Sequence, residues 1–514
     1  MTQTNVIVIG SGFGGAVSAS SIAEAGFTVK ILERGPWRDS LPNESQDIPN
    51  RVPFPTEGWN FWSKVLRTVR NNKLPGGSLT LNKDGFYEVF FGKGLNIACS
   101  SNVGGGSHAY GGLNMLPPSP DYWDGISDKL SSQQMTKHYT SVLERMGSST
   151  PSDEHIPLSI RKRFIYSENI QSGADIGNLQ MGYLFPKEAG NPQEVITEDG
   201  VRRYEIAPAE GGFLGSPKGG KTSLDVAYLY HAMKNGLEVC DQHEVLAIRK
   251  ANKKGQPRYC VKVENHHTGL FEEHFADHVI VAAGTLNTLA LLLQSRDGHK
   301  GLGGMPRLGL DFGSNGDYFA YWDLKNKQQD LTQSHTVNGY LRLKERDGEA
   351  QADQPTIVET PAPCPDKLRL PSWVANKMRQ GTFVAGMGKD AMDGVVSLKK
   401  GKLSIDYNPD NSTIFSDIRK QMDLIGERTG SRILSFKRPT TVHPTGGACI
   451  GLDTNSGVVN DKGEVLDHPG LYVADAAALP KPVEGPPAIT IAAWANHVAE
   501  QLIVKLRHTK DANS

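Results

Sequence analysis

The sequence predicts an α/β fold with a parallel sheet, and three strand–turn–helix segments carry this prediction. The first is "NVIVIGSGFGGAVSASSIAEAGFTVKIL", in which a short apolar run precedes a glycine-rich turn and a helix. The second joins a strand at 279–282 to an apolar helix through a turn at Gly284. The third places a strand before Asp475 and a helix from about Pro486. Short, continuous apolar runs are typical of parallel strands that are buried on both faces.

The first of these turns has the spacing of a dinucleotide-binding site. Gly10, Gly12 and Gly15 fit the pattern G-x-G-x-x-G. In this pattern the first glycine permits a tight turn, the second lets the backbone approach a pyrophosphate, and the third lets the helix pack closely on the strand. Glu33 follows the second strand, where it would accept hydrogen bonds from a ribose. We therefore expect FAD or NAD rather than NADP.

Bulk properties exclude several other classes of protein. The chain of 514 residues is long enough for two domains, and its net charge of −1 gives no overall field that would favour nucleic acid or anionic lipid. We see no basic leader and no apolar run of roughly 18 residues, so we expect a cytoplasmic protein without a transmembrane helix. The 5 cysteines form no CxxC pair and the 15 histidines show no ligand-like spacing, so we expect neither a disulfide framework nor a metal site.

Further glycine-rich segments indicate backbone that runs against a ligand. The stretch 91–116, "FGKGLNIACSSNVGGGSHAYGGLNML", has too few apolar positions to fill a core. With "GSGFGG", "GGKTSLDVAYL", "AAGTLNT", "HPTGGACIG" and "LYVADAAALP", it resembles the glucose–methanol–choline oxidoreductases, and within them the cholesterol-oxidase branch. The resemblance spans nearly the whole chain, with the motifs in the right order.

The resemblance implies an α/β protein that binds FAD. Its Rossmann-like FAD-binding domain would be assembled from discontinuous segments, and an α+β substrate domain with a β-sheet would be inserted between them. Asp475 would hold the ribityl chain and Gly284 would lie near the adenosine. The implied FAD-binding segments are 1–44, 85–124, 218–318 and 438–514, the substrate-binding segments are 125–217 and 319–437, and 45–84 would form a covering loop. The implied cofactor-binding residues are Gly10, Gly12, Phe13, Gly14, Gly15, Glu33, Gly104, Gly105, Gly106, Ser107, Gly111, Val245, Gly284, Asp475, Gly485 and Pro486.

His443 is the leading candidate for a catalytic residue. Alcohol oxidation by a flavin requires a base for the hydroxyl proton, and in this family the histidine of the matching "HP" motif contacts the substrate hydroxyl above the flavin. The alternative is a buried histidine at a turn before proline.

Two other positions depart from the family pattern: Gly485 stands where a second His or Asn is usual, and Tyr110 where Asn is common. Tyr110 would supply a phenol to the substrate or flavin, or pack against the ring. His108 falls one residue too early for a covalent link, so we expect non-covalent FAD and a surface or pocket histidine.

A catalytic carboxylate is the remaining feature of the cholesterol-oxidase branch. The corresponding stretch "TIVETPAPCPDKLRL" contains Glu359 and Asp366. Glu359 ranks first because it follows an apolar run and could point inward from a strand, whereas either acid could instead be a solvated loop residue.

The leading hypothesis is an FAD-dependent oxidoreductase that acts on CH–OH groups, with His443 as base and Tyr110 or Glu359 as helpers. Its substrate would be a small-molecule alcohol (sterol-like, polycyclic or sugar-like), and its electron acceptor would be oxygen or an external carrier. Gly485 and Tyr110 leave a redox-neutral isomerase or lyase as the alternative. A third hypothesis is a non-catalytic protein that retains FAD as a scaffold.

Overall fold

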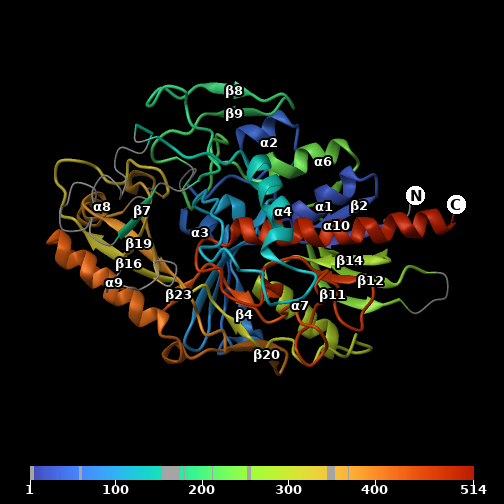
Figure 1. The fold of residues 1–514 in the computed structure, drawn as a ribbon. Helices are drawn as coiled ribbons and strands as arrows, with labels where there is room; N and C mark the ends of the chain where they lie inside the picture. Colours follow the sequence, from blue (N-terminus) through green and yellow to red (C-terminus); the bar gives the residue numbers. More distant parts are fainter. Residues whose placement is uncertain are drawn as a thin grey trace.

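In the computed structural model, the described residues form three large sheets, four smaller sheets and the helices that pack against them (Figure 1). Parts of the predicted second domain, including 156–173 and 344–353, lie outside the residues that the structure describes. The described residues are 5–56, 61–152, 154–155, 174–177, 180–210, 212–251, 256–337, 339–343, 354–368 and 370–513.

A five-stranded parallel sheet forms the centre of the nucleotide-binding half of the molecule. Its strand order is β10–β2–β1–β14–β25, so strands from both ends of the chain meet in one sheet. The four residues of β1 are all buried, as the apolar run predicts. The α/β fold with Rossmann-like elements is therefore confirmed. The strands are β1 (Val6–Ile9), β2 (Val29–Leu32), β10 (Glu238–Cys240), β14 (His278–Val281) and β25 (Leu471–Val473).

The register of this sheet brings four loops to one edge. Ile9 pairs with Leu32 and with Val281, and Val281 pairs with Val473. Four parallel strands therefore end level with one another, and the segments that follow them lie side by side. This carboxyl edge is where ligands bind in open α/β sheets.

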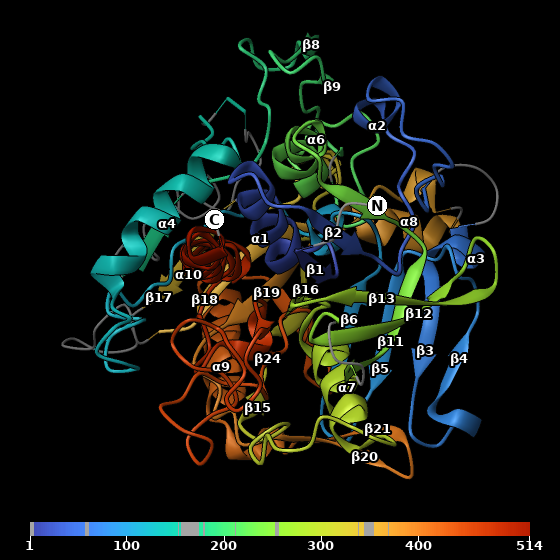
Figure 2. The same cartoon turned by 90° about the vertical axis from the view of Figure 1, so that its right-hand side faces the viewer.

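Helices and a second small sheet cover the parallel sheet. Helix α10 packs against both α1 and α4, and Figure 2 shows α10 nearly end-on between these two helices. The antiparallel sheet β11–β12–β13 contacts β1 through β13 and α7 through β11. These elements are α1 (Phe13–Glu24), α4 (Ser132–Arg145), α7 (Thr285–Asp297), α10 (Ala488–Asn513), β11 (His243–Lys250), β12 (Tyr259–Asn265) and β13 (Leu270–Ala276).

A six-stranded antiparallel sheet, in the order β22–β16–β19–β18–β17–β7, forms the second large layer. Helix α9 covers one face, where a Cβ atom added at Gly386 would lie 2.4 Å from Ile418. On the other face, Val358 and Ala385 pack with Leu113 and residues near it in a separate apolar cluster. The elements are β7 (Ala174–Gly177), β16 (Tyr318–Asp323), β17 (Tyr340–Leu343), β18 (Thr356–Pro361), β19 (Thr382–Met387), β22 (Arg432–Ser435) and α9 (Ile414–Thr429).

The segment 45–84 differs from the loop that the sequence suggests. It contributes β3 and β4 to a third sheet, in the order β23–β6–β5–β3–β4. Its strands lack an apolar pattern because they bury polar groups: Arg67 and Thr68 of β3 are both buried, and Glu88 of β5 forms ion pairs with Arg34 and Arg70. The strands are β3 (Leu66–Arg70), β4 (Ser78–Thr80), β5 (Tyr87–Phe91), β6 (Asn96–Ser100) and β23 (Thr440–Thr441).

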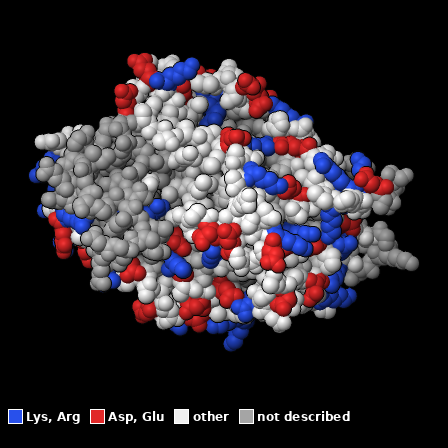
Figure 3. All heavy atoms as spheres, viewed as in Figure 1, with Lys and Arg blue, Asp and Glu red and all other residues white. Residues whose placement is uncertain are grey.

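The remaining described elements are short. A single π-helical turn at Asp225–Leu229 leads into α6. On the face shown in Figure 3, basic and acidic side chains are intermixed. Within the described ranges, no helix combines the length and apolar character that crossing a bilayer requires. The short elements are α2 (Leu41–Ser45), α3 (Phe61–Val65), α6 (Tyr230–Lys234), α8 (Ser372–Arg379), β8 (Glu194–Ile196), β9 (Arg202–Tyr204), β15 (Phe312–Gly313), β20 (Val395–Lys399), β21 (Lys402–Asp406) and β24 (Thr445–Gly446).

Candidate functional site

The turn after β1 and the first residues of α1 leave no room for a side chain at Gly10, Gly14 and Gly15. Gly10 has a φ of +93°, and a Cβ atom there would lie 2.4 Å from the carbonyl oxygen of Ala282. A Cβ atom at Gly14 would lie 2.3 Å from the Ala474 oxygen, and one at Gly15 would lie 1.9 Å from the Gly10 oxygen. The turn is therefore pressed against the segments that follow β14 and β25.

Gly12 is the position that faces open space. A Cβ atom there would meet only the Cα atom of Gly105, at 3.9 Å. Gly12 is also the N-cap of α1, and no side chain caps the helix or places an acid in its first turn. The free N–H groups and the positive end of the helix dipole at this point suit a phosphate.

Glu33 closes one side of this cradle at the end of β2. Its Oε2 accepts hydrogen bonds from the backbone N–H of Ser11 at 2.9 Å and from the Ser11 hydroxyl at 2.8 Å, and its Oε1 accepts from the Gly35 N–H at 2.7 Å. Burial raises the pKa of Glu33 above its ordinary value, although these hydrogen bonds oppose the shift. A carboxylate has about four acceptor sites, so roughly one remains for a ribose hydroxyl.

A second glycine turn lies directly against the first. The Ser11 hydroxyl accepts a hydrogen bond from the Gly104 N–H at 3.0 Å, and a Cβ atom at Gly105 would lie 2.5 Å from the Cα atom of Gly12. Ser107 fixes this turn, since its hydroxyl donates to the Gly104 oxygen at 2.7 Å and accepts from the Leu224 N–H at 3.0 Å. Gly106 is exposed, and a Cβ atom there would meet no atom within 4 Å.

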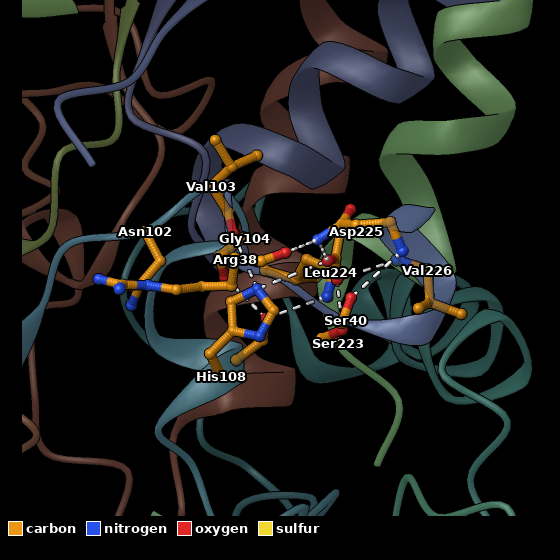
Figure 4. A network of polar contacts seen from close by, with 12 residues as sticks. Arg38, Ser40, Asn102, Val103, Gly104, His108, Ser223, Leu224, Asp225 and Val226 are labelled. Atoms are coloured by element: carbon orange, nitrogen blue, oxygen red, sulfur yellow. Dashed lines mark hydrogen bonds and ion pairs between the residues drawn. The ribbon is translucent and has the colours of Figure 1, made fainter. Parts of the chain in front are cut away.

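His108 lies behind these turns in a buried polar network, which Figure 4 shows. Only 3% of its surface is exposed, so the predicted surface position was wrong, whereas the alternative of a pocket position stays a prediction. Its Nε2 lies 2.9 Å from the Val103 oxygen and 3.5 Å from Asp225 Oδ2. Asp225 in turn accepts hydrogen bonds from the Ser223 hydroxyl and, at 3.1 Å, from the Val226 N–H. Burial lowers the pKa of His108, although the neighbouring Asp225 carboxylate opposes this shift.

Tyr110 is held by three groups that the sequence did not assign to it. Its hydroxyl donates to the Thr222 oxygen at 2.8 Å, and its ring makes an edge contact with Phe13 at 5.4 Å between centroids. The ammonium of Lys221 donates to the carbonyl oxygens of His108, Tyr110 and Gly212 at 2.9, 2.8 and 3.0 Å. Burial lowers the pKa of Lys221 to about 7, while three carbonyl acceptors match the three N–H groups of the charged form.

Asp475, at the end of β25, joins three parts of the cradle. Its Oδ2 accepts from the Gly284 N–H at 2.9 Å and from the Thr288 hydroxyl at 2.5 Å, while its Oδ1 accepts from the Ala477 N–H at 3.0 Å. Burial raises the pKa of Asp475 to about 6. Gly284 itself is exposed, with a φ of +81°.

His443 is oriented by Asp317, a residue that the sequence analysis missed. The Nδ1 atom of His443 lies 3.0 Å from Asp317 Oδ1, and the Asp317 side chain is only 2% exposed. Asp317 Oδ2 also accepts from the N–H groups of Val442 at 3.1 Å and His443 at 3.2 Å, and from the Thr441 hydroxyl. Because a carboxylate can only accept here, Nδ1 carries a proton, and in the neutral imidazole Nε2 then has the lone pair. The His443 side chain is 27% exposed, so it lies at a surface that a small molecule can reach.

The loop that carries His443 is tied to the cradle. The hydroxyl of Thr285, the first residue of α7, donates to the Pro444 oxygen at 2.6 Å. The preceding residue, Gly284, is bonded to Asp475. His443 is thus held next to the carboxyl edge of the parallel sheet.

Gly485 lies close to the same segment as Asp317. Its carbonyl oxygen accepts from the Asn315 amide at 2.6 Å, and Asn315 Oδ1 accepts from the Glu484 N–H at 2.8 Å. A Cβ atom at Gly485 would make an ordinary contact of 3.5 Å with Pro118, so the backbone does not require glycine. Pro486 is buried just before α10 begins.

Glu359 does not join this group, although it lies in a strand and is fully buried as its apolar surroundings suggest. It pairs with Val384, which shares a face of the sheet with Gly386, and Gly386 meets α9. Tyr110 lies toward the other face, where its hydroxyl would be 2.9 Å from a Cβ atom at Gly182. The structure therefore does not bring Glu359 together with Tyr110, and a role for Glu359 at the substrate has no geometric support.

Three other positions considered from the sequence have clear places in the fold. Asp366 is exposed and forms an ion pair with Arg379. Val245 is half-buried on β11, whose first residue, His243, donates its N–H to the Glu33 oxygen at 2.8 Å. A Cβ atom at Gly111 would lie 2.8 Å from Val337, so this glycine permits close packing.

A cavity of about 350 Å³ borders the Tyr110 loop. Gly212 lines it and also accepts the hydrogen bond from Lys221 that stabilises this loop. Its volume is within the range of small-molecule pockets. Hydroxyl and apolar groups share its wall, with lining residues that include Thr332, Ser334, Thr336, Pro361, Ala362 and Cys364.

These features fit a bound dinucleotide with redox chemistry at its far end. The uncapped start of α1 suits a pyrophosphate, Glu33 suits the adenosine ribose, and the buried Asp475 lies with His443 at the opposite side of the edge. The fold and the site thus define a nucleotide-dependent oxidoreductase.

The comparisons with known proteins identify the family. Models of the GMC oxidoreductase family match residues 7–312 and 419–495. Cholesterol oxidases from Acinetobacter baumannii and Mycobacterium tuberculosis are each 23% identical to this chain, over 97% and 96% of it and 94% and 90% of their own lengths. The solved structure of pyridoxine 4-oxidase from Mesorbium loti has a TM-score of 0.64 and 16% identity, and covers 97% of this chain and 99% of its own. The chain belongs to the GMC oxidoreductase family, and it is an FAD-dependent alcohol oxidoreductase.

Proposed function

We propose that the protein oxidises a small-molecule alcohol to a carbonyl compound, with His443 accepting the hydroxyl proton. The observation that carries this proposal is the His443–Asp317 pair. Asp317 fixes the neutral tautomer in which Nε2 is the acceptor, and it stabilises the charge that forms when Nε2 takes a proton. Bound FAD would supply the hydride acceptor.

The other polar residues of the site hold His443 and the cofactor cradle in place. Thr285 fixes the Pro444 carbonyl, and Asp475 fixes the start of α7, so His443 keeps one position relative to the cofactor cradle. Tyr110 would pack beside the cofactor rather than share the proton, because its hydroxyl already donates to Thr222. A substrate hydroxyl would therefore meet a single oriented imidazole.

Relatives named cholesterol oxidase, and a structural neighbour named pyridoxine 4-oxidase, suggest oxygen as the electron acceptor and leave a wide range of alcohols as substrates. We propose a sterol-like, polycyclic or sugar-like alcohol whose unreactive end occupies the cavity beside Gly212. The five cysteines are free thiols, which fits a reducing compartment, and we place the protein in the cytoplasm.

Gly485 favours a second candidate, a redox-neutral isomerisation or elimination. Without a side chain at this position, the site lacks the second hydrogen-bonding group that usually accompanies the histidine in the family. A site with one oriented base could move a proton on carbon without net oxidation.

One anaerobic experiment separates these functions. The FAD-loaded protein is mixed with sterols, polycyclic alcohols and sugars while its flavin absorbance is followed, and the products are identified by mass spectrometry. Bleaching with formation of the carbonyl product supports alcohol oxidation, and His443→Gln should then slow bleaching by about 10²–10⁴-fold at unchanged FAD content. Product without bleaching would support the redox-neutral reaction. Neither bleaching nor product with any class would contradict both proposals.

A further inference from the structure

A compact group of two histidines and one glutamate lies between α4 and α10, away from the residues assigned to the cofactor. His138 comes from α4, and His497 and Glu500 lie one turn apart on α10. Figure 2 shows these two helices side by side. Nothing in the linear sequence indicates this group, because His138 is far from the other two residues along the chain.

The spacing of the three side chains is that of metal ligands. One potential ligand atom from each residue lies within 4.8 Å of the other two, and His138 Nε2 is 3.5 Å from Glu500 Oε2. The two imidazole centroids are 5.4 Å apart. In a tetrahedral site with metal–nitrogen bonds of about 2.0–2.1 Å, ring centroids lie roughly 5 Å apart and ligand atoms roughly 3.3 Å apart. A small closing movement would therefore complete the geometry.

Hydrogen bonds already prepare both imidazoles as ligands. The Nε2–H of His497 is held by the Asp461 carbonyl oxygen at 2.8 Å, which leaves Nδ1 as the nitrogen with the lone pair. Such a backbone acceptor behind a ligating histidine is common in metal sites. The His138 side chain is 4% exposed, and its Nε2 is buried with no hydrogen-bond partner among the described residues. A buried ring nitrogen of this kind needs a partner.

The charges of the group suit a cation. Glu500 supplies a carboxylate, which is the one anionic group among the three residues. Glu500 is 44% exposed, which leaves room for water to complete the coordination.

We propose that His138, His497 and Glu500 bind a divalent transition-metal ion of the zinc type, which joins α4 to α10. Two imidazoles and a carboxylate are a known zinc ligand set, with a water as the fourth ligand. The proposal is independent of the reaction at His443. It departs from the expectation, drawn from the histidine spacing, that the chain has no metal site.

Lys137 is the natural competitor for this ion. Its ammonium contacts both Glu500 oxygens, at 2.6 and 2.7 Å, and its side chain is 61% exposed, so it can swing into solvent. Metal binding would replace this ion pair. Removing the ammonium should therefore strengthen metal binding, whereas an ordinary ion-pair network would gain no affinity for a metal.

The test uses the FAD-loaded full chain after treatment with a chelator and gel filtration. Zn²⁺ is added, its stoichiometry is measured by elemental mass spectrometry, and its affinity is measured by competition with a chromophoric chelator. We expect one Zn²⁺ per chain and a Tm increase of about 2–4 °C. His138→Ala, His497→Ala and Glu500→Gln should each weaken binding tenfold or more, and Lys137→Gln should tighten it several-fold. His508→Ala, an exposed histidine on the same helix, is the matched control and should bind normally.

The absence of stoichiometric Zn²⁺ would overturn the proposal, and so would equal affinity in the His138, His497 and His508 variants. Lys137→Gln keeps the test decisive if a histidine variant fails to fold, because Lys137 is exposed and its replacement should leave the core intact. Unchanged Zn²⁺ affinity in Lys137→Gln would also contradict the proposal.

Discussion

Asp317→Asn tests the central claim about the candidate active site with a change of very few atoms. Three donors surround one carboxylate oxygen of Asp317, namely the N–H groups of Val442 and His443 and the Thr441 hydroxyl. In the variant these donors should select the amide oxygen, so the amide nitrogen must face Nδ1 of His443. An amide N–H can only donate, which makes Nδ1 the acceptor and moves the ring proton to Nε2. The imidazole then has no lone pair to offer the substrate.

The expected loss follows from the role of a general base. Such groups contribute about 10²–10⁴-fold, which corresponds to about 3–5 kcal/mol of transition-state stabilisation. Anaerobic stopped-flow reduction of the flavin, with the alcohol that bleaches the wild type, measures this rate directly. We expect FAD content and Tm near wild-type values, because the amide oxygen of the variant can accept the same three hydrogen bonds from residues 441–443.

Asp323→Asn is the matched control for this variant. Asp323 ends β16, the strand that begins immediately after Asp317, and its carboxylate pairs with Lys377 at 2.6 Å rather than with a histidine. Its flavin reduction rate should stay within about twofold of the wild type. If Asp317→Asn reduced its flavin at the wild-type rate, His443 would not be acting as a base with this tautomer.

Other variants test the cradle and the buried charges. Gly14→Ala should abolish FAD binding, because its Cβ would lie 2.3 Å from the Ala474 oxygen. Gly485→Ala should change stability by less than about 1 kcal/mol and keep FAD bound. The flavin absorbance of the purified proteins measures the FAD content of both variants. Burial alone would raise the pKa of Glu88, but Arg34 and Arg70 lower it from 4.5 to about 2. The ion pairs therefore stabilise the fold by about 3 kcal/mol above pH 4.5, and this contribution is lost as the pH falls toward 2. Urea unfolding should therefore show Glu88→Gln less stable by about 3 kcal/mol at pH 7 and by progressively less below pH 4.5; a pH-independent difference would refute this linkage. Lys221→Met leaves three carbonyl oxygens without their donor and should cost about 3 kcal/mol; wild-type stability in the same unfolding assay would show that these hydrogen bonds contribute little.

The parts of this fold that could be predicted are those with local signals. In three places a short apolar run, which predicts a buried strand, is followed directly by a residue typical of a nucleotide site. These residues are Gly10, Glu33 and, near the end of the chain, Asp475. Their convergence follows from the topology of a parallel sheet, since residues after level strands must share an edge. This is why the segments that form the FAD cradle could be predicted from the sequence.

The remaining features depend on contacts that leave no local pattern. Asp317 is the clearest example, because its partner His443 lies in a distant segment and no motif surrounds the aspartate. Glu359 shows a different limit: its apolar neighbours predict a buried strand, but β18 is covered on both faces, so alternation could not reveal that the side chain faces α9. Strand β3 was missed because it buries Arg67 and Thr68, which replace the expected apolar residues.

The strand order also determines when the cofactor can be bound during synthesis. Val6 pairs with Val29 and with His278, and Val279 pairs with Leu471, so β1 gains its second neighbour only after half of the chain is made and β14 gains its second neighbour near residue 471. At about 5–20 residues per second, the ribosome needs roughly 20–90 s to pass from the first strand of the parallel sheet to the last. β2 has an open edge until β10 is made and β1 until β14 is made, while β14 keeps an open edge until β25 is made, and other chains could pair with these edges. Because Asp475 follows β25 and binds the Gly284 N–H, the complete FAD cradle can form only after this last strand of the sheet has been made.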